Sequence, residues 1–150
     1  MKFRFVWIGK TKDKNWKALQ EEYLRRLSHF VRCEVTEVRD SVRNDTTEIE
    51  GKRILELLNP KNFVCLLESS GKTMGSEELA AEIEKWQNRS LKEVTFIIGG
   101  ADGVSSGIRE IADFRLSLSF MTFTHDMARV ILLEQLYRAF TIIKGFPYQR

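Results

Sequence analysis

Residues 63–98, FVCLLESSGKTMGSEELAAEIEKWQNRSLKEVTFII, contain two apolar runs, the second interrupted only by Thr95, with a helical pattern between them. The runs Phe63–Leu67 and Val94–Ile98 are typical of strands that are covered on both faces. Between them, Ser76 is a good N-cap, and acidic residues follow it in the first turn, where the helix dipole favours them. Apolar residues then recur at helical spacing, at Leu79, Ile83 and Trp86. This strand–helix–strand order predicts a βαβ unit with parallel strands.

The same alternation extends to both ends of the chain. We expect further strands at Phe3–Ile8, Cys33–Val38 and Phe114–Leu118. We expect further helices at Trp16–Phe30, Ile49–Leu58, Ser106–Ile111 and Met127–Ile143. The apolar stripe of the first is Trp16, Leu19, Tyr23, Leu27 and Phe30. There is no linker or internal repeat. The fold class is therefore α/β, a mostly parallel sheet with helices on both faces, in a single domain over residues 1–150.

The last of these helices is apolar on nearly every side. From Met127 to Ile143, twelve of seventeen residues are apolar, aromatic or Ala. A surface helix needs an apolar stripe only about 100° wide, and a domain of 150 residues has little interior in which to hide more. We therefore expect one face to pack on the sheet and the other on a second copy, in a homodimer.

Composition excludes several classes of protein. The 150 residues are 43% hydrophobic and 30% charged, with no apolar run near the roughly 20 residues of a membrane span and no signal-peptide pattern. We expect a cytoplasmic protein with no membrane contact. Cys33 and Cys65 fit reduced thiols, and no cluster of His, Cys and carboxylates predicts a metal site.

The net charge of +3 is unevenly distributed. Residues 1–32 hold nine Lys and Arg against three Asp and Glu. Such a basic segment fits contact with a phosphate backbone, and it equally fits a solvated surface that keeps the protein soluble.

Three loops at strand ends carry the chemical signals. They are Leu67–Lys72, Ile98–Gly103 and Leu116–Phe123. Ligands of parallel sheets bind at the carboxyl ends of the strands, so these loops together predict a small-molecule pocket. The Gly-Gly-x-x-Gly of the second loop matches no phosphate-binding motif and is also typical of a tight turn.

His125 stands at the start of the last helix, after the expected N-cap Thr124. The positive end of a helix disfavours the imidazolium, so a neutral His125 fits a hydrogen-bond acceptor or general base. A helix-start residue with a local hydrogen bond is the alternative.

The chain resembles the methyltransferase H family, bacterial enzymes of the SPOUT superfamily that methylate N3 of a pseudouridine in 23S ribosomal RNA. The likeness covers essentially the whole chain, including residues 6–10 and 23–26. Its most specific stretches are FIIGGADG at 96–103, LSLSFMTF at 116–123, HDMARV at 125–130 and EQLYRAF at 134–140.

The resemblance implies a C-terminal trefoil knot, an obligate homodimer, and S-adenosylmethionine bound in the knot. It implies that Leu67, at the end of one strand, and Gly99, just after the next strand, bind the cofactor. The remaining cofactor positions are Leu118, Ser119, Phe120, Met121, Thr122 and Phe123. Phe120 stands where relatives often carry a smaller or a basic residue. The implied substrate is 23S rRNA in the large subunit or the assembled ribosome.

The family ends in Tyr-His-Arg or Tyr-His-Lys, whereas this chain ends in Tyr148-Gln149-Arg150. A glutamine cannot take a proton at neutral pH. Three explanations stay open. The family histidine serves recognition; His125 or the α-carboxylate of Arg150 replaces it as proton acceptor; or this homologue is slow, altered in substrate, or a dimer that binds RNA or nucleotide without methyl transfer.

The catalytic candidates are therefore Tyr148, Arg150, His125 and Arg138. Arg150 is expected to supply charge to the substrate imide or a phosphate, and Tyr148 to position the base. Arg138 and Glu134 lie one turn apart on the last helix. They either support this site or form an ordinary i,i+4 ion pair.

Overall fold

A computed structural model describes residues 1–39, 47–100 and 103–148. Its strands are β1 (Lys2–Ile8), β2 (Arg32–Val38), β3 (Phe63–Thr73), β4 (Glu93–Ile98) and β5 (Phe114–Ser117). Its helices are α1 (Lys14–Leu27), α2 (Thr47–Leu57), α3 (Ser76–Asn88), α4 (Ser106–Ile111) and α5 (His125–Lys144). The alternation predicted from the sequence is confirmed, and most ends of the elements move by a few residues. Strand β3 is longer than expected, because it continues past Leu67 to Thr73.

The strands form one parallel sheet in the order β2-β1-β4-β3-β5. The two apolar runs are neighbours in it, with Cys65 opposite Phe96. Because β3 and β4 have strands on both sides and helices on both faces, both need apolar residues at successive positions. The prediction of a mostly parallel sheet is confirmed.

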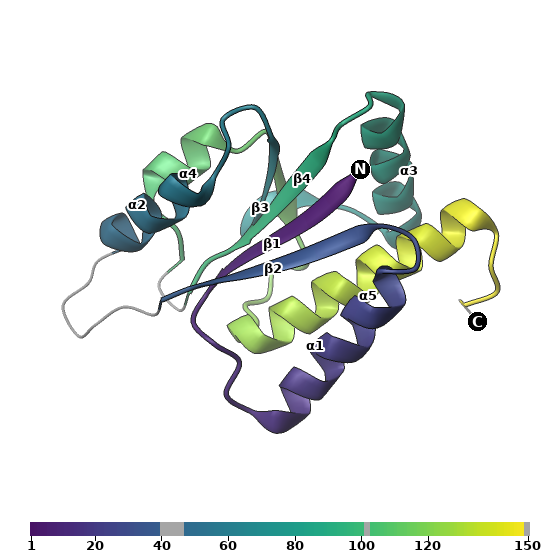
Figure 1. Ribbon diagram of the computed structural model, residues 1–150, viewed down its shortest axis with the longest axis horizontal. Coiled ribbons are helices and arrows are strands. Elements are labelled where there is room, and N and C mark those ends of the chain that lie inside the picture. The colour runs from purple at the N-terminus through teal and green to yellow at the C-terminus, as the bar shows by residue number, and fades with distance from the viewer. Residues whose placement is uncertain (40–46, 101–102, 149–150) are drawn as a thin grey trace.

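Helices cover both faces of the sheet (Figure 1). The helices α1, α3 and α5 lie on one face, and α2 and α4 lie on the other. Successive side chains of β1 point to opposite faces of the sheet and so contribute to the hydrophobic cores on both sides of it. Phe3, Phe5 and Trp7 enter the core under α5, whereas Val6 and Ile8 enter the core under α2 and α4.

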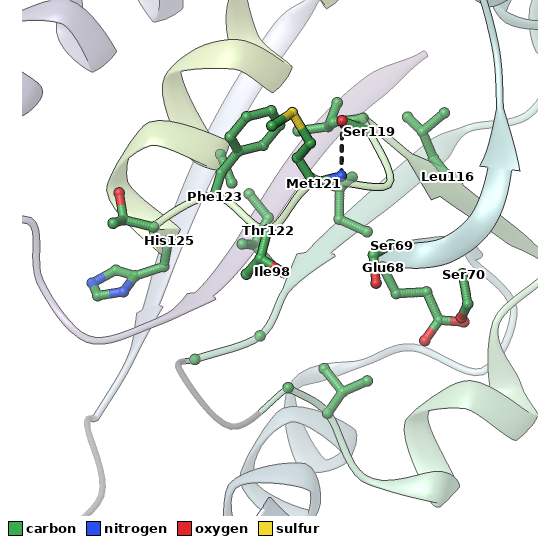
Figure 2. Close-up of a pocket in the computed structure, with 18 of the residues that line it drawn as sticks. Glu68, Ser69, Ser70, Ile98, Leu116, Ser119, Met121, Thr122, Phe123 and His125 are labelled. Carbon is green, nitrogen blue, oxygen red and sulfur yellow. Dashed lines mark hydrogen bonds between the residues drawn. The ribbon is translucent and has the colours of Figure 1, made fainter.

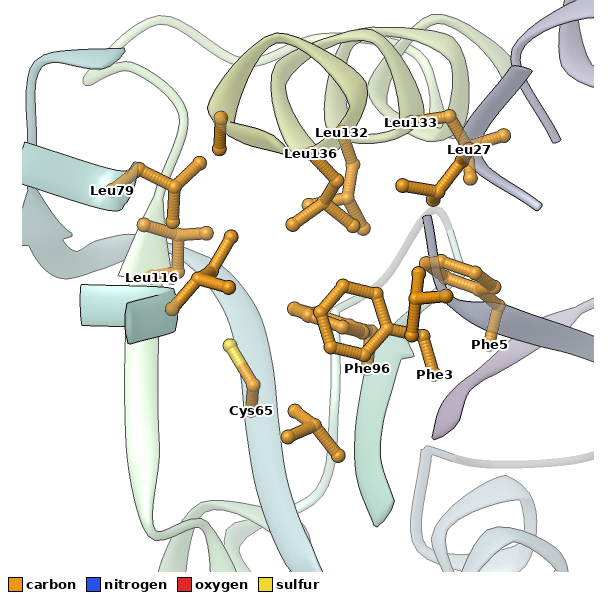
Figure 3. Packing of buried hydrophobic residues seen from close by; sticks show 14 of the residues in the cluster. Phe3, Phe5, Leu27, Cys65, Leu79, Phe96, Leu116, Leu132, Leu133 and Leu136 are labelled. Atoms are coloured by element: carbon orange, nitrogen blue, oxygen red, sulfur yellow. The ribbon is translucent and has the colours of Figure 1, made fainter. Parts of the chain in front are cut away.

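Helix α5 is covered by its own chain more fully than the sequence predicted. It lies on the sheet between α1 and α3, and Leu132, Leu133 and Leu136 are fully buried against Phe3 and Phe96 (Figure 3). None of the large apolar side chains of α5 is among the exposed ones. The apolar composition of this helix therefore does not by itself require a second copy, because two flanking helices and the sheet cover three of its sides.

The predicted apolar stripe of α1 is wrong at one position. Leu19 is 43% exposed and Trp16 is only half-buried. The buried residue of this turn is Gln20, whose Oε1 accepts a 2.8 Å hydrogen bond from Thr11 Oγ1. The helix is rotated so that part of its apolar stripe faces away from the core.

The N-cap predicted for α3 is also wrong by one residue. Gly75 is the N-cap, and its backbone N–H donates to Glu78 Oε2 at 2.6 Å. The Ser76 hydroxyl instead donates to Gln135 Oε1 of α5 at 2.6 Å, so it fastens α3 to α5. A tertiary partner has replaced the local capping bond that the sequence pattern favours.

Both cysteines are free thiols. Burial raises the pKa of Cys33 to about 12 and raises the pKa of Cys65 further, so neither is a thiolate at neutral pH. Over the described ranges, no helix has the length and apolar character needed to cross a membrane, and no group of His, Cys, Asp and Glu could hold a metal ion.

Candidate cofactor and active site

Two of the three predicted loops, those after β4 and β5, enclose one cavity of about 600 Å³ together with residues 67–70 of β3 (Figure 2). The expected loop Leu67–Lys72 is wrong: this stretch belongs to β3, whose pairing with β5 shifts register between Leu67 and Lys72. Of the eight residues expected to bind the cofactor, seven line this cavity: Leu67, Gly99, Leu118, Ser119, Met121, Thr122 and Phe123. Phe120 does not, and its side chain is 81% exposed. Parallel pairing brings these distant segments together, because it places all carboxyl ends of the strands on one edge of the sheet.

The loop after β5 is held by hydrogen bonds between its own residues. The Ser117 hydroxyl donates to the carbonyl of Ser119 at 3.1 Å. The Ser119 hydroxyl in turn accepts the backbone N–H of Met121 at 3.0 Å (Figure 2). This turn sends Phe120 outward while its neighbours stay on the cavity wall.

The described residues of the glycine loop after β4, which are Gly99, Gly100 and Gly103, line the cavity. The N–H of Gly103 donates to the carbonyl of Gly100 at 3.1 Å, and Gly103 has φ of +81°, which favours glycine. A Cβ on Gly99 would lie 2.7 Å from the carbonyl oxygen of Gly103. The space beside Gly99 is therefore filled by the loop itself. Residues 101–102 lie outside the described ranges.

Sequence reasoning missed an ion-pair cluster on the cavity wall. Glu68 accepts hydrogen bonds from Arg109 Nε at 2.9 Å and from Arg115 Nη1 at 2.8 Å. Burial alone would raise the pKa of Glu68, but the two guanidinium groups outweigh it and hold that pKa below its usual value. Glu68 and Arg109 line the cavity. Glu68 stands in a stretch that the sequence had singled out, here part of β3, whereas no sequence pattern marks Arg109.

His125 also lines the cavity, as the first residue of α5. The predicted cap is confirmed, because Thr124 Oγ1 accepts the N–H of Met127 at 3.4 Å. His125 Nε2 lies 3.5 Å from Asp126 Oδ1, and the ring is partly exposed. The side chain is thus placed where a group bound in the cavity could reach it, and its role as a base stays a prediction.

The other catalytic candidates lie at the far end of α5. The Tyr148 hydroxyl donates to Glu134 Oε1 at 3.2 Å, and Arg138 Nε donates to the same oxygen at 2.9 Å. The Tyr148 ring contacts Tyr137 at a centroid distance of 4.7 Å and lies 5.0 Å from the Arg138 guanidinium carbon. The predicted i,i+4 pair of Glu134 and Arg138 is therefore present, and it holds Tyr148.

This C-terminal cluster (Glu134, Arg138, Tyr148) is remote from the cavity of its own chain. Glu134 and Arg138 lie nine and thirteen positions after His125 on α5, which corresponds to roughly 14 and 20 Å along a helix. Burial first, and then Tyr23 and the Glu134 carboxylate, raise the pKa of Tyr148, so its hydroxyl keeps its proton at neutral pH. Gln149 and Arg150 lie outside the described residues.

Comparison with known proteins gives the chain its family. Residues 1–149 match the family model described as "Predicted SPOUT methyltransferase". The chain is 40% identical to the ribosomal RNA large subunit methyltransferase H of Clostridium kluyveri and 38% identical to that of Streptococcus pneumoniae, and each alignment covers both chains completely.

A solved structure shows the same fold at low sequence identity. It is a methyltransferase from Legionella pneumophila in complex with the cofactor SAM, 14% identical, with a TM-score of 0.51 over 93% of this chain and 66% of that one. The fold, the full-length family match and the full-length relatives agree. The chain belongs to the SPOUT methyltransferase family.

Proposed function

We propose that this protein transfers a methyl group from S-adenosylmethionine to N3 of a pseudouridine in 23S rRNA of the large ribosomal subunit. The observation that carries the proposal is the cavity at the carboxyl ends of β3, β4 and β5, in a chain that aligns end to end with ribosomal RNA large subunit methyltransferases H. Its size of about 600 Å³ falls in the range of small-molecule sites.

The residues present fit the cofactor. Leu67, Ile98 and Leu118 offer an apolar wall that suits an adenine ring. Hydroxyl groups and the Glu68–Arg109 pair lie on the same cavity and suit a ribose and an amino acid. When bound, the cofactor supplies an electrophilic methyl group on a sulfonium.

The chain has three further tasks. It must align N3 with that methyl group, stabilise charge on the carbonyls that flank N3, and accept the N3 proton. His125, on the cavity wall, is the proposed proton acceptor. Arg150 is the proposed source of positive charge, and Tyr148, which stays protonated, is the proposed positioning group.

We also propose that the working unit is a homodimer. One chain places His125 and the C-terminal cluster roughly 14–20 Å apart along α5, so a second copy would have to bring its C-terminus to this cavity to complete the site. The exposed Leu19 and half-buried Trp16 of α1 offer an apolar surface for that contact. The single domain is proposed to be threaded as a trefoil knot by the segment that leads from β5 to α5.

Light scattering tests the dimer. At micromolar concentration we expect a mass near twice 17.5 kDa. Leu19→Asp places a charge on the proposed contact surface and should shift the mass toward that of one chain, while the exposed substitution Lys12→Asp on the adjacent loop serves as its control. A wild-type protein of 17.5 kDa would contradict the dimer.

Transfer of tritiated methyl groups tests the reaction. We expect label to pass from S-adenosylmethionine to large subunits or ribosomes from a strain that lacks the modification, and not to ribosomes that already carry it. Naked 23S rRNA, subunits and assembled ribosomes as separate substrates show which form is recognised. A chain with a net charge of only +3 gains little affinity from phosphate contacts alone. We therefore expect subunits or assembled ribosomes, which offer a large preformed RNA surface, to be better substrates than naked 23S rRNA.

A specific observation supports the alternative, a dimer that binds RNA without methyl transfer. Gln149 stands where the family carries histidine. Cofactor and ribosome binding with no transfer of label to any of the three substrates would favour this alternative.

A further inference from the structure

The charged groups on the cavity wall are few. Among the described residues that line the cavity, Arg109 carries the one permanent positive charge, and Glu68 carries the one carboxylate. Glu68 has only 9% of its side chain exposed and is paired on both oxygens, one with Arg109 and one with Arg115. Two guanidinium groups on one carboxylate leave a net charge of +1 beside the cavity.

Arg109 still has donors to offer. Its Nε is engaged with Glu68, and its two terminal nitrogens have no partner among the described residues. The side chain is half exposed, at 50%. The bond to Glu68 restricts where the guanidinium can lie, so part of the conformational entropy of a long side chain is already lost before a ligand arrives.

We propose that Arg109 binds the α-carboxylate of the methionine part of S-adenosylmethionine. This inference rests on the proposed function. The cofactor has a single anionic group, and the cavity wall has a single permanent cation in the described ranges. A carboxylate that leaves water needs a charged partner, and the planar N–H pair of a guanidinium matches its two oxygens.

The position of the two arginines favours the cofactor over RNA as the partner of Arg109. Both pair with Glu68, but Arg109 lines the cavity and Arg115 does not. A contact with an RNA phosphate would need no access to the cavity, and Arg115 would serve it equally well. Arg115 therefore provides a matched control with the same carboxylate partner and the same degree of exposure.

Calorimetric binding of two cofactor derivatives to the full-length protein tests the proposal. S-adenosylhomocysteine retains the carboxylate, and 5′-methylthioadenosine lacks the whole amino acid. We expect Arg109→Ala to weaken S-adenosylhomocysteine binding about 10- to 100-fold, the range of a charge-assisted hydrogen bond, and to leave 5′-methylthioadenosine binding within about twofold. Arg115→Ala should change neither affinity by more than about threefold.

Several outcomes would overturn the proposal. One is unchanged S-adenosylhomocysteine binding in Arg109→Ala, with a raised KM for ribosomes pointing instead to an RNA phosphate. Another is an equal loss of affinity for both derivatives in Arg109→Ala and also in Arg109→Lys, the variant that keeps a charge beside Glu68. Failure of the wild-type protein to bind either derivative would instead contradict the cofactor assignment itself, so the two failures are distinguishable.

Discussion

Replacing Arg150 by Ala is expected to lower methyl transfer to ribosomes by roughly 100- to 1,000-fold, the usual effect of removing one donor that stabilises developing charge. Affinity for S-adenosylhomocysteine should stay within about twofold, because the seven cofactor positions that line the cavity belong to other segments. The measurement is single-turnover methyl transfer with saturating cofactor, beside calorimetric binding. Unaltered turnover would contradict the role given to Arg150.

Mixing two inactive variants shows whether that residue acts across the dimer. We expect His125→Ala to be inactive as well, because it removes the proposed proton acceptor from the cavity wall. If each site combines the cavity of one protomer with the C-terminus of the other, random mixed dimers rebuild one intact site in half of the molecules. About a quarter of wild-type activity should then return. No recovery after verified subunit exchange would place both residues in the same protomer's site.

Replacing Arg129 by Met is expected to lower the free energy of unfolding by about 2–4 kcal/mol. Arg129 is fully buried, donates to the carbonyl of Ile8 and to Thr11 Oγ1, and lies over the Trp7 ring at 4.8 Å. Methionine matches the volume but leaves these acceptors without their donor. Urea denaturation measures the change, and the melting temperature should fall by about 5–15 °C.

Two controls separate the reasons for that loss. Arg129→Lys keeps the charge but not the planar fork, so its stability should lie between those of the wild type and Arg129→Met. Asp126→Asn weakens the longer, partly exposed contact with Arg129 at 3.4 Å and the contact with His125 at 3.5 Å, leaves the bonds of Arg129 to Ile8 and Thr11 in place, and should cost less than about 1 kcal/mol. A loss below about 1 kcal/mol in Arg129→Met would show that the buried arginine does not hold β1 to α5.

The elements and the sheet could be predicted because each depends on short-range pattern. The run Phe63–Leu67 and the run Val94–Ile98 have no polar residue in them except Thr95, so they indicated buried parallel strands. The errors arose where a distant side chain replaced a local partner, as at Ser76, which bonds Gln135 in place of its own helix. The sequence assigned the second apolar face of α5 to a second copy, whereas α1 and α3 of the same chain already cover two of its sides; the dimer itself stays a prediction.

The site was predicted in part. The loops after β4 and β5 could be found because parallel pairing places them on one edge, and seven of eight expected positions line the cavity. The expected loop Leu67–Lys72 is instead part of β3, because its polar residues stay paired beside β5 after a shift of register. The pairing of Glu68 with Arg109 and Arg115 could not be found from the sequence. The two arginines lie 41 and 47 positions after Glu68 along the chain, and no periodic signal links them to it. The bond of Tyr148 to Glu134 could not be found either, because residues 145–148 follow the end of α5 and no pattern predicts where they turn.

The sequence by itself determined the alternating elements, the parallel sheet and the strand ends that form the cavity, since side-chain periodicity and turn residues act over a few positions. Only the tertiary structure decided which charges meet and how α5 is covered. Those outcomes depend on packing between segments that are distant along the chain, and no local spacing encodes such packing.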